Sequence, residues 1–181
     1  GISQGTASFS TNISNNNGFV IGGGRYSPSQ SPVAFVNAYI RDFRIIKGTG
    51  VYTSNFTPPT EPLTAIAGTT LLTCQNGYFV DNSVSAHAIT TFGNTSVVPF
   101  GPYDHGPYDP AVNRGSMFTS LSLNSNNFLT TAATSALEFG SENFTIEFWW
   151  YPTSTSRQAL YHASYGTDWS VGIDFNGTGV Q

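Results

Sequence analysis

The chain has 181 residues, a net charge of −4 and only 9% Asp, Glu, Lys and Arg, against roughly 25% in an average soluble domain. Lys47 is its single lysine, so no basic stripe exists to neutralise phosphates, and we expect no nucleic-acid partner. No run of about 18 apolar residues occurs, so we expect no membrane insertion either.

Short runs of β-branched and aromatic residues, bounded by Asn, Gly, Ser and Pro, recur along the chain and predict β-strands. No segment keeps apolar residues at helical spacing for three turns, and Ala132–Phe139 is expected to form one short helical turn at most. Many short strands without helices predict an all-β sandwich or barrel. The predicted strands are Thr6–Ile13, Gly18–Ile21, Val36–Ile46, Thr70–Cys74, His87–Phe92, Ser116–Leu123, Phe144–Tyr151, Gln158–Ser164 and Trp169–Phe175.

Alternation within two of these runs predicts which side chains share a face. In 144–151 one face is apolar, with Phe144, Ile146, Phe148 and Trp150. Its opposite face begins polar and ends aromatic, with Thr145, Glu147, Trp149 and Tyr151. In 39–46 strict alternation gives two mixed faces, one with Tyr39, Arg41, Phe43 and Ile45, the other with Ile40, Asp42, Arg44 and Ile46.

Two proline-rich stretches predict irregular loops. Pro58 and Pro59 follow the second of these strands, and proline cannot donate to a strand ladder. Thr60–Thr69 is therefore expected to be a connector. The echo of Gly-Pro-Tyr-Asp at 101–104 and 106–109 predicts a surface loop.

Residues that could perform chemistry are few. A hydrolase needs paired carboxylates or an activated nucleophile, and Glu147 has no such partner in the pattern of jelly-roll glycosidases, so we expect no enzyme. His87, His105 and His162 lack metal-ligand spacing; the best cluster, around Tyr103, Asp104 and His105, is interpreted as a solvated loop. The lone Cys74 is interpreted as a small buried apolar residue.

Two blocks of the sequence resemble one known family. Asn37–Gly48, followed by Tyr52–Pro59, closely resembles the closing strand and exit loop of concanavalin A-like, laminin-G-type jelly rolls, which are frequent in bacteriophage virion proteins. Arg41 replaces the first of the family's usual two acidic residues, and Asp42 keeps the second. The segments that resemble the beginning of the same module are Leu71–Gln75, Val80–Ser83, Ser120–Asn124 with Asn127–Leu129, and Phe139–Trp149.

The order of these blocks predicts a division of the chain. Residues 1–66 would be the C-terminal part of one laminin-G-like sandwich, and residues 67–181 the N-terminal part of a following one. Two arrangements stay open: two partial sandwiches in tandem, favoured if the chain is an excerpt of a longer polypeptide, or one permuted sandwich if the 181 residues form a compact unit. Both ends are expected to be cuts in a longer polypeptide.

The resemblance implies a noncatalytic virion structural protein of a fibre, spike or capsid decoration, in an extracellular particle. Its expected partners are other virion proteins, further copies of itself and host-surface glycans. A secreted bacterial carbohydrate-binding lectin or adhesin is the alternative, and a glycosidase or its accessory module comes third. No cofactor is expected, although relatives often hold Ca²⁺ through Asp side chains, and Asp168 and Asp174 are candidates in type. The candidate glycan-contacting aromatics are Trp149, Tyr151, Tyr161, Tyr165 and Trp169, unless most of them lie in the core.

Overall fold

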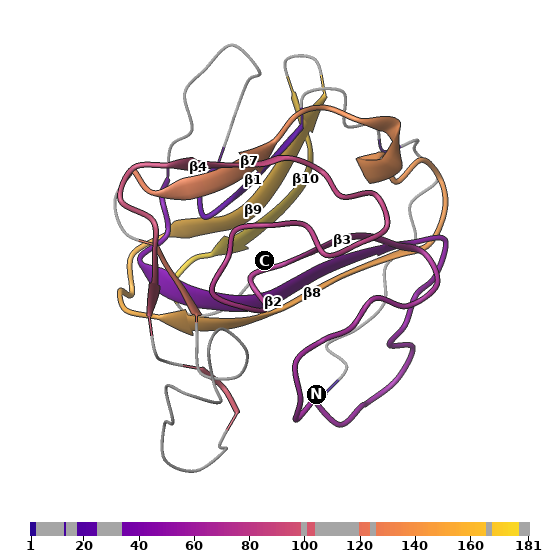
Figure 1. The fold of residues 1–181 in the computed structure, drawn as a ribbon, viewed down its shortest axis with the longest axis horizontal. Coiled ribbons are helices and arrows are strands. Elements are labelled where there is room, and N and C mark those ends of the chain that lie inside the picture. The colour runs from indigo at the N-terminus through magenta and orange to yellow at the C-terminus, as the bar shows by residue number, and fades with distance from the viewer. Residues whose placement is uncertain are drawn as a thin grey trace.

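A computed structural model describes residues 1–2, 13, 18–24, 34–98, 101–103, 120–123, 126–165 and 168–177; at 120–123, 164–165 and 168–170 it describes the main chain. Apart from one short 3₁₀ helix, the regular secondary structure of the described part is β-strand, in two antiparallel sheets that lie one above the other in Figure 1. The β9 sheet runs in the order β10 (Asp168–Phe175), β9 (Gln158–Tyr165), β1 (Phe19–Ile21), β7 (Phe128–Thr131) and β4 (Ile89–Phe92). The β2 sheet contains β3 (Thr69–Thr73), β2 (Ala38–Lys47), β6 (Ser120–Leu123), β5 (Ser96–Val98) and β8 (Phe144–Pro152). The predicted all-β sandwich is confirmed.

The long strand β2 organises its sheet. One edge of β2 pairs with β8 from Ala38 opposite Pro152 to Lys47 opposite Phe144. Its other edge is shared, because β6 pairs with 38–40 and β3 pairs with 43–46. β2 therefore lies in the middle of the sheet, and β8 lies at its edge.

The hydrophobic core lies between the sheets. The ring of Phe43 stacks on Phe148 of its own sheet at 5.2 Å between centroids and lies 5.5 Å from the ring of Tyr161 in the other sheet. The predicted apolar face of β8 is confirmed, since all four of its residues pack against this core. Cys74 is buried as predicted, and burial raises the pKa of its thiol to about 12.

The prediction of two mixed faces on β2 is wrong, because a β-bulge interrupts the alternation. The pairing with β8 shifts register between Arg41 and Arg44, and Asp42 has a left-handed φ of 52°. The extra residue turns Phe43 to the same face as Ile40, in the core. Arg41 and Arg44 consequently both lie on the outer face of the β2 sheet.

Most other predicted strands are observed, with two differences. The block Ser120–Asn124 with Asn127–Leu129, which resembles one strand of the family, forms two strands, β6 and β7, which belong to different sheets. The short strand β5 was not predicted, and the predicted helical turn is the 3₁₀ helix η1 (Ser135–Leu137). Of the predicted strand Thr6–Ile13, only Ile13 lies within the described residues, where it bridges to Gly140.

Strands from the two predicted segments of the chain lie side by side in both sheets. β1, from residues 1–66, lies between β7 and β9, and β2 lies between β8 and the β3 and β6 strands. Within this chain the two segments thus share one sandwich. Their origin as the end and the start of successive modules stays a prediction.

Candidate functional site: the strap pocket

Residues 48–66, here called the strap, cross the outer face of the β2 sheet, on the side away from the β9 sheet (Figure 1). Its prolines cannot donate to a ladder, so side chains hold it in place. The amide of Val51 donates to Thr145 Oγ1 at 2.9 Å, and the same hydroxyl donates to the carbonyl of Thr49 at 3.1 Å. At the far end, Arg44 Nη1 donates to the carbonyl of Thr64 at 2.5 Å.

Glu147 is the centre of the strap's attachment. Its Oε1 atom lies 2.7 Å from Arg44 Nε and 2.5 Å from Arg44 Nη2, while Oε2 accepts a hydrogen bond of 2.6 Å from the Tyr52 hydroxyl. The side chains of Arg44 and Glu147 are only 7% and 11% exposed. Burial and the adjacent carboxylate raise the pKa of Tyr52 to about 12, so its hydroxyl stays a donor at neutral pH.

A second buried cluster, here called the Asp42 clasp, lies beside the first. Arg41 Nε is 3.3 Å from Asp42 Oδ2, and both side chains are essentially inaccessible to water. The hydroxyl of Tyr103 donates to the same carboxylate oxygen and accepts a bond of 3.0 Å from Trp149 Nε1. Burial raises the pKa of Asp42, opposed by the Tyr103 hydrogen bond and the Arg41 charge. The clasp ties the bulge of β2 to β8 and to Tyr103, which lies far away in the sequence.

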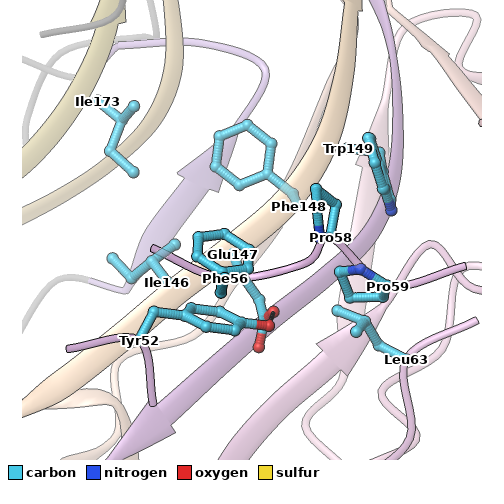
Figure 2. Close-up of a pocket in the computed structure, with 10 residues that line it drawn as sticks. All are labelled: Tyr52, Phe56, Pro58, Pro59, Leu63, Ile146, Glu147, Phe148, Trp149 and Ile173. Carbon is cyan, nitrogen blue, oxygen red and sulfur yellow. Dashed lines mark hydrogen bonds between the residues drawn. The ribbon is translucent and has the colours of Figure 1, made fainter. Parts of the chain in front are cut away.

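A pocket of about 470 Å³ lies between the strap and the edge of the sandwich (Figure 2). It is lined by Tyr52, Phe56, Pro58, Pro59, Leu63, Ile146, Glu147, Phe148, Trp149 and Ile173. Four consecutive residues of β8 line it, and successive strand residues point to opposite faces. One cavity can touch both faces only along the strand's edge, so the pocket runs past the edge of β8.

The chemistry of the pocket is that of rings and aliphatic groups. Tyr52 and Phe56 stack on each other with centroids 3.9 Å apart. Among the described lining residues Glu147 is the charged one, and Arg44 neutralises it. The indole N–H of Trp149 already donates a hydrogen bond to the Tyr103 hydroxyl. The pocket therefore offers apolar surface with few polar groups to hold a strongly hydrated ligand.

The structure brings only some of the candidate glycan-contacting residues to a surface. Trp149 lines the pocket, and Tyr151, two residues on along the same face, is 56% exposed and stacks on Tyr39 at 6.2 Å. Tyr161 is fully buried in the core. The side chains of Tyr165 and Trp169 lie outside the described residues, although both main chains belong to strands.

The candidate calcium residues have other partners or are not described. Asp174 lies 2.8 Å from His162 Nε2 and 2.9 Å from Arg157 Nη2, and the side chain of Asp168 lies outside the described residues. Within the described ranges, no three His, Cys, Asp or Glu side chains gather as a metal site. Of the predicted loop cluster only Tyr103 is described, and it is buried in the Asp42 clasp.

Sequence reasoning missed half of the pocket. Tyr52, Phe56 and Leu63 were read only as parts of an exit loop or connector, and Pro58 and Pro59 only as a stop for the strand. The density of rings in 52–59 was the available signal. A loop rich in Tyr, Phe and Pro directly after a strand has apolar surface to cover, which favours packing back on the sheet.

No protein-family model matches the chain, and no curated protein or solved structure matches it either. Among the described residues, no helix is long and apolar enough to span a bilayer.

Proposed function

We propose that this chain is a noncatalytic structural module of a bacteriophage virion, as part of a fibre, a spike or a capsid decoration. In this role the sandwich, which we propose to be of the jelly-roll type, presents loops and edge strands to other virion proteins and to copies of itself. The laminin-G-type resemblance supports this assignment. Its two most recognisable stretches, 37–48 and 139–149, supply β2 and most of β8, which pair directly.

One observation carries the noncatalytic part of the proposal. A glycoside hydrolase needs an acid with a second carboxylate roughly 5–10 Å away across the substrate. Glu147 instead has both oxygens bound, to Arg44 and Tyr52, and the described pocket lining adds no second carboxylate. Its work is to hold the strap. Turnover of any polysaccharide that disappears in Glu147→Gln, with folding intact, would contradict this assignment.

The virion assignment is tested on particles. Particles of the phage that encodes this chain are purified on a density gradient and labelled with antibodies raised against the recombinant protein. We expect gold label at fixed, symmetry-related positions in electron micrographs and the chain's peptides in the particle fraction. Particles without label, together with the chain in the culture medium or on the bacterial surface, would overturn the proposal.

A carbohydrate-binding lectin or adhesin is the second candidate, favoured by Trp149 in the pocket and Tyr151 exposed beside it. Aromatic faces at a sheet surface can stack on pyranose rings. A glycan array probed with the recombinant chain tests this role. Binding that is lost in both Trp149→Ala and Tyr151→Ala, but kept in a Thr91→Ala control on the exposed strand β4, would favour it.

A further inference from the structure

The loop that follows β3 contains an Asn-Gly pair, Asn76 and Gly77, in which the asparagine side chain folds back on the main chain. The amide N–H of Tyr78 donates to Asn76 Oδ1 at 3.0 Å, so the side chain closes a turn across the Gly77 peptide group. Asn76 and Gly77 are both partly exposed, so water reaches them. The turn therefore holds the carboxamide of Asn76 over the peptide bond that follows it.

An asparagine held in this way can react with its own main chain. The nitrogen of Gly77 loses its proton to hydroxide and attacks Cγ of Asn76. The bond from Cγ to Nδ2 then breaks, and the nitrogen leaves as ammonia with a proton from water. Water opens the resulting five-membered succinimide at one of its two carbonyls, which leaves aspartate or isoaspartate at position 76.

Two features of the loop favour this reaction at Asn76. Gly77 has no side chain to hinder its nitrogen, and the N–H of Tyr78 points at Oδ1, the atom that becomes negatively charged in the tetrahedral intermediate. Asn94 provides a comparison within the chain. It is more exposed than Asn76, but the β-branched Thr95 follows it and crowds the attacking nitrogen. Exposure alone would select Asn94, whereas the chemistry of ring closure selects Asn76.

We propose that Asn76 is a site of spontaneous deamidation and that its conversion frees the end of the strap. The preceding residue, Gln75, joins the Asp42 clasp to the strap. Its carbonyl accepts a hydrogen bond of 2.9 Å from Arg41 Nη2, and its side-chain amide donates to the carbonyl of Leu63. Isoaspartate adds a methylene group to the main chain and a carboxylate next to this junction. The turn at Asn76 is then lost, and Gln75 no longer holds both partners.

The reaction is followed by peptide mapping of the purified chain during incubation at mildly alkaline pH. We expect Asn76 to convert at least as fast in the folded chain as in urea, where the turn is absent, and Asn94 to persist in the folded chain. Faster conversion of Asn76 in urea would show that the fold protects it, and would overturn the proposal. Conversion of Asn94 in the folded chain at the rate of Asn76 would overturn it as well.

Two substitutions of Tyr78 isolate the turn, because its side chain is 69% exposed while its main-chain N–H makes the hydrogen bond. Tyr78→Pro removes this N–H, and Tyr78→Ala keeps it. In the folded state the proline variant should deamidate about tenfold more slowly than the alanine variant, less than for a donor in a dry enzyme site because water replaces part of its effect. The same pair in urea gives the effect of proline on the unfolded sequence. Equal folded-state rates after this correction would contradict the proposal.

The release of the strap is measured by limited proteolysis of fresh and aged protein. Cleavage within 48–66 should be about fivefold faster in the aged wild type, the change expected when local opening breaks one hydrogen bond fewer. Asn76→Gln is the matched control, because its longer side chain does not form the five-membered ring, and its cleavage should not change with age. Isoaspartate at position 76 with unchanged cleavage would overturn the release of the strap.

The inference goes beyond the virion assignment and does not rest on it. Deamidation and proteolysis are measured on the purified chain, whereas the assignment is tested on particles. A labelled particle whose chain keeps Asn76 intact defeats the deamidation alone, and a chain that deamidates but is absent from particles defeats the virion role alone.

Discussion

At the scale of single residues, Asp42 decides how β2 presents its side chains. Its left-handed conformation inserts the bulge that sends Ile40, Phe43 and Ile45 to the core and both arginines outward. The sequence contains a sign of this bulge. Ile40 and Phe43 are three positions apart and Phe43 and Ile45 are two apart, whereas residues on one face of an uninterrupted strand are separated by even numbers of positions. The sequence around Asp42 gives no sign of which side chain binds its carboxylate, because Tyr103 is 61 residues away.

The conformation of Asp42 can be tested by comparing two substitutions that both remove its side-chain contacts. Asp42→Gly should be more stable than Asp42→Ala by about 1 kcal/mol, because alanine is strained at positive φ and glycine is not. Urea denaturation followed by tryptophan fluorescence measures the difference. At Tyr39, an ordinary strand position of β2, the order should reverse, with alanine the more stable replacement. Equal stability of the two Asp42 variants would contradict the bulge.

The buried carboxyl of Asp42 also predicts a dependence on pH. Burial raises its pKa in the folded protein above the ordinary value of 3.8, so the folded state binds the proton more tightly than the unfolded chain. Its contribution to stability is therefore fully present below 3.8 and is lost as the pH rises through the raised pKa. Asp42→Asn removes this titration. Relative to that variant, the wild type should gain stability on acidification from neutral pH towards 3.8, measured as paired urea midpoints; a constant difference across this range would contradict it.

At the scale of elements, β8 was predictable and the strap was not. Large apolar residues at every second position from Phe144 to Trp150 fix the core face of β8 locally. The strap has no period of its own, and its conformation depends on hydrogen bonds from Val51 and Tyr52 to residues 94 and 95 positions away. The sequence of the strap shows that it has aromatic surface to bury. Only the folded sheet shows that Thr145 and Glu147 lie where they can bind it.

The attachment of the strap predicts a coupled pair of substitutions. Tyr52→Phe should cost about 1 kcal/mol through the lost hydrogen bond, and Glu147→Gln about 3 kcal/mol because Arg44 is left buried without its counter-charge. The double variant should cost less than the sum, since both changes remove the same contact. Chemical denaturation gives the energies, and faster proteolysis within 48–66 reports local release. Ser54→Ala, at an exposed position of the strap, is the control and should leave stability and proteolysis unchanged. Costs that add exactly in the double variant would show that Tyr52 and Glu147 do not act together.

At the scale of the whole molecule, the sheets depend on pairings between distant parts of the chain. The family resemblance located the two blocks, and alternation identified most strands, but neither determines that β2 lies between β8 and β3. That order follows from the match of whole apolar faces across the sandwich. In the folded chain β1 and β2 are each hydrogen-bonded along both edges. Without the rest of the chain, all four of these edges would lose their partners, which destabilises any isolated fragment.

This interleaving predicts that neither predicted segment folds alone. A fragment of residues 1–66 would contain β1 and β2 without any of their strand partners, and a fragment of 67–181 would lack the central strands of both sheets. Each fragment should show a disordered circular dichroism spectrum with no cooperative thermal transition. Mixing them in equal amounts should restore the β-sheet spectrum, a cooperative transition and a 1:1 complex in sedimentation, because the buried apolar area and the paired edges return together. A fragment of 67–181 that melts cooperatively by itself would contradict this prediction and mark an independent domain.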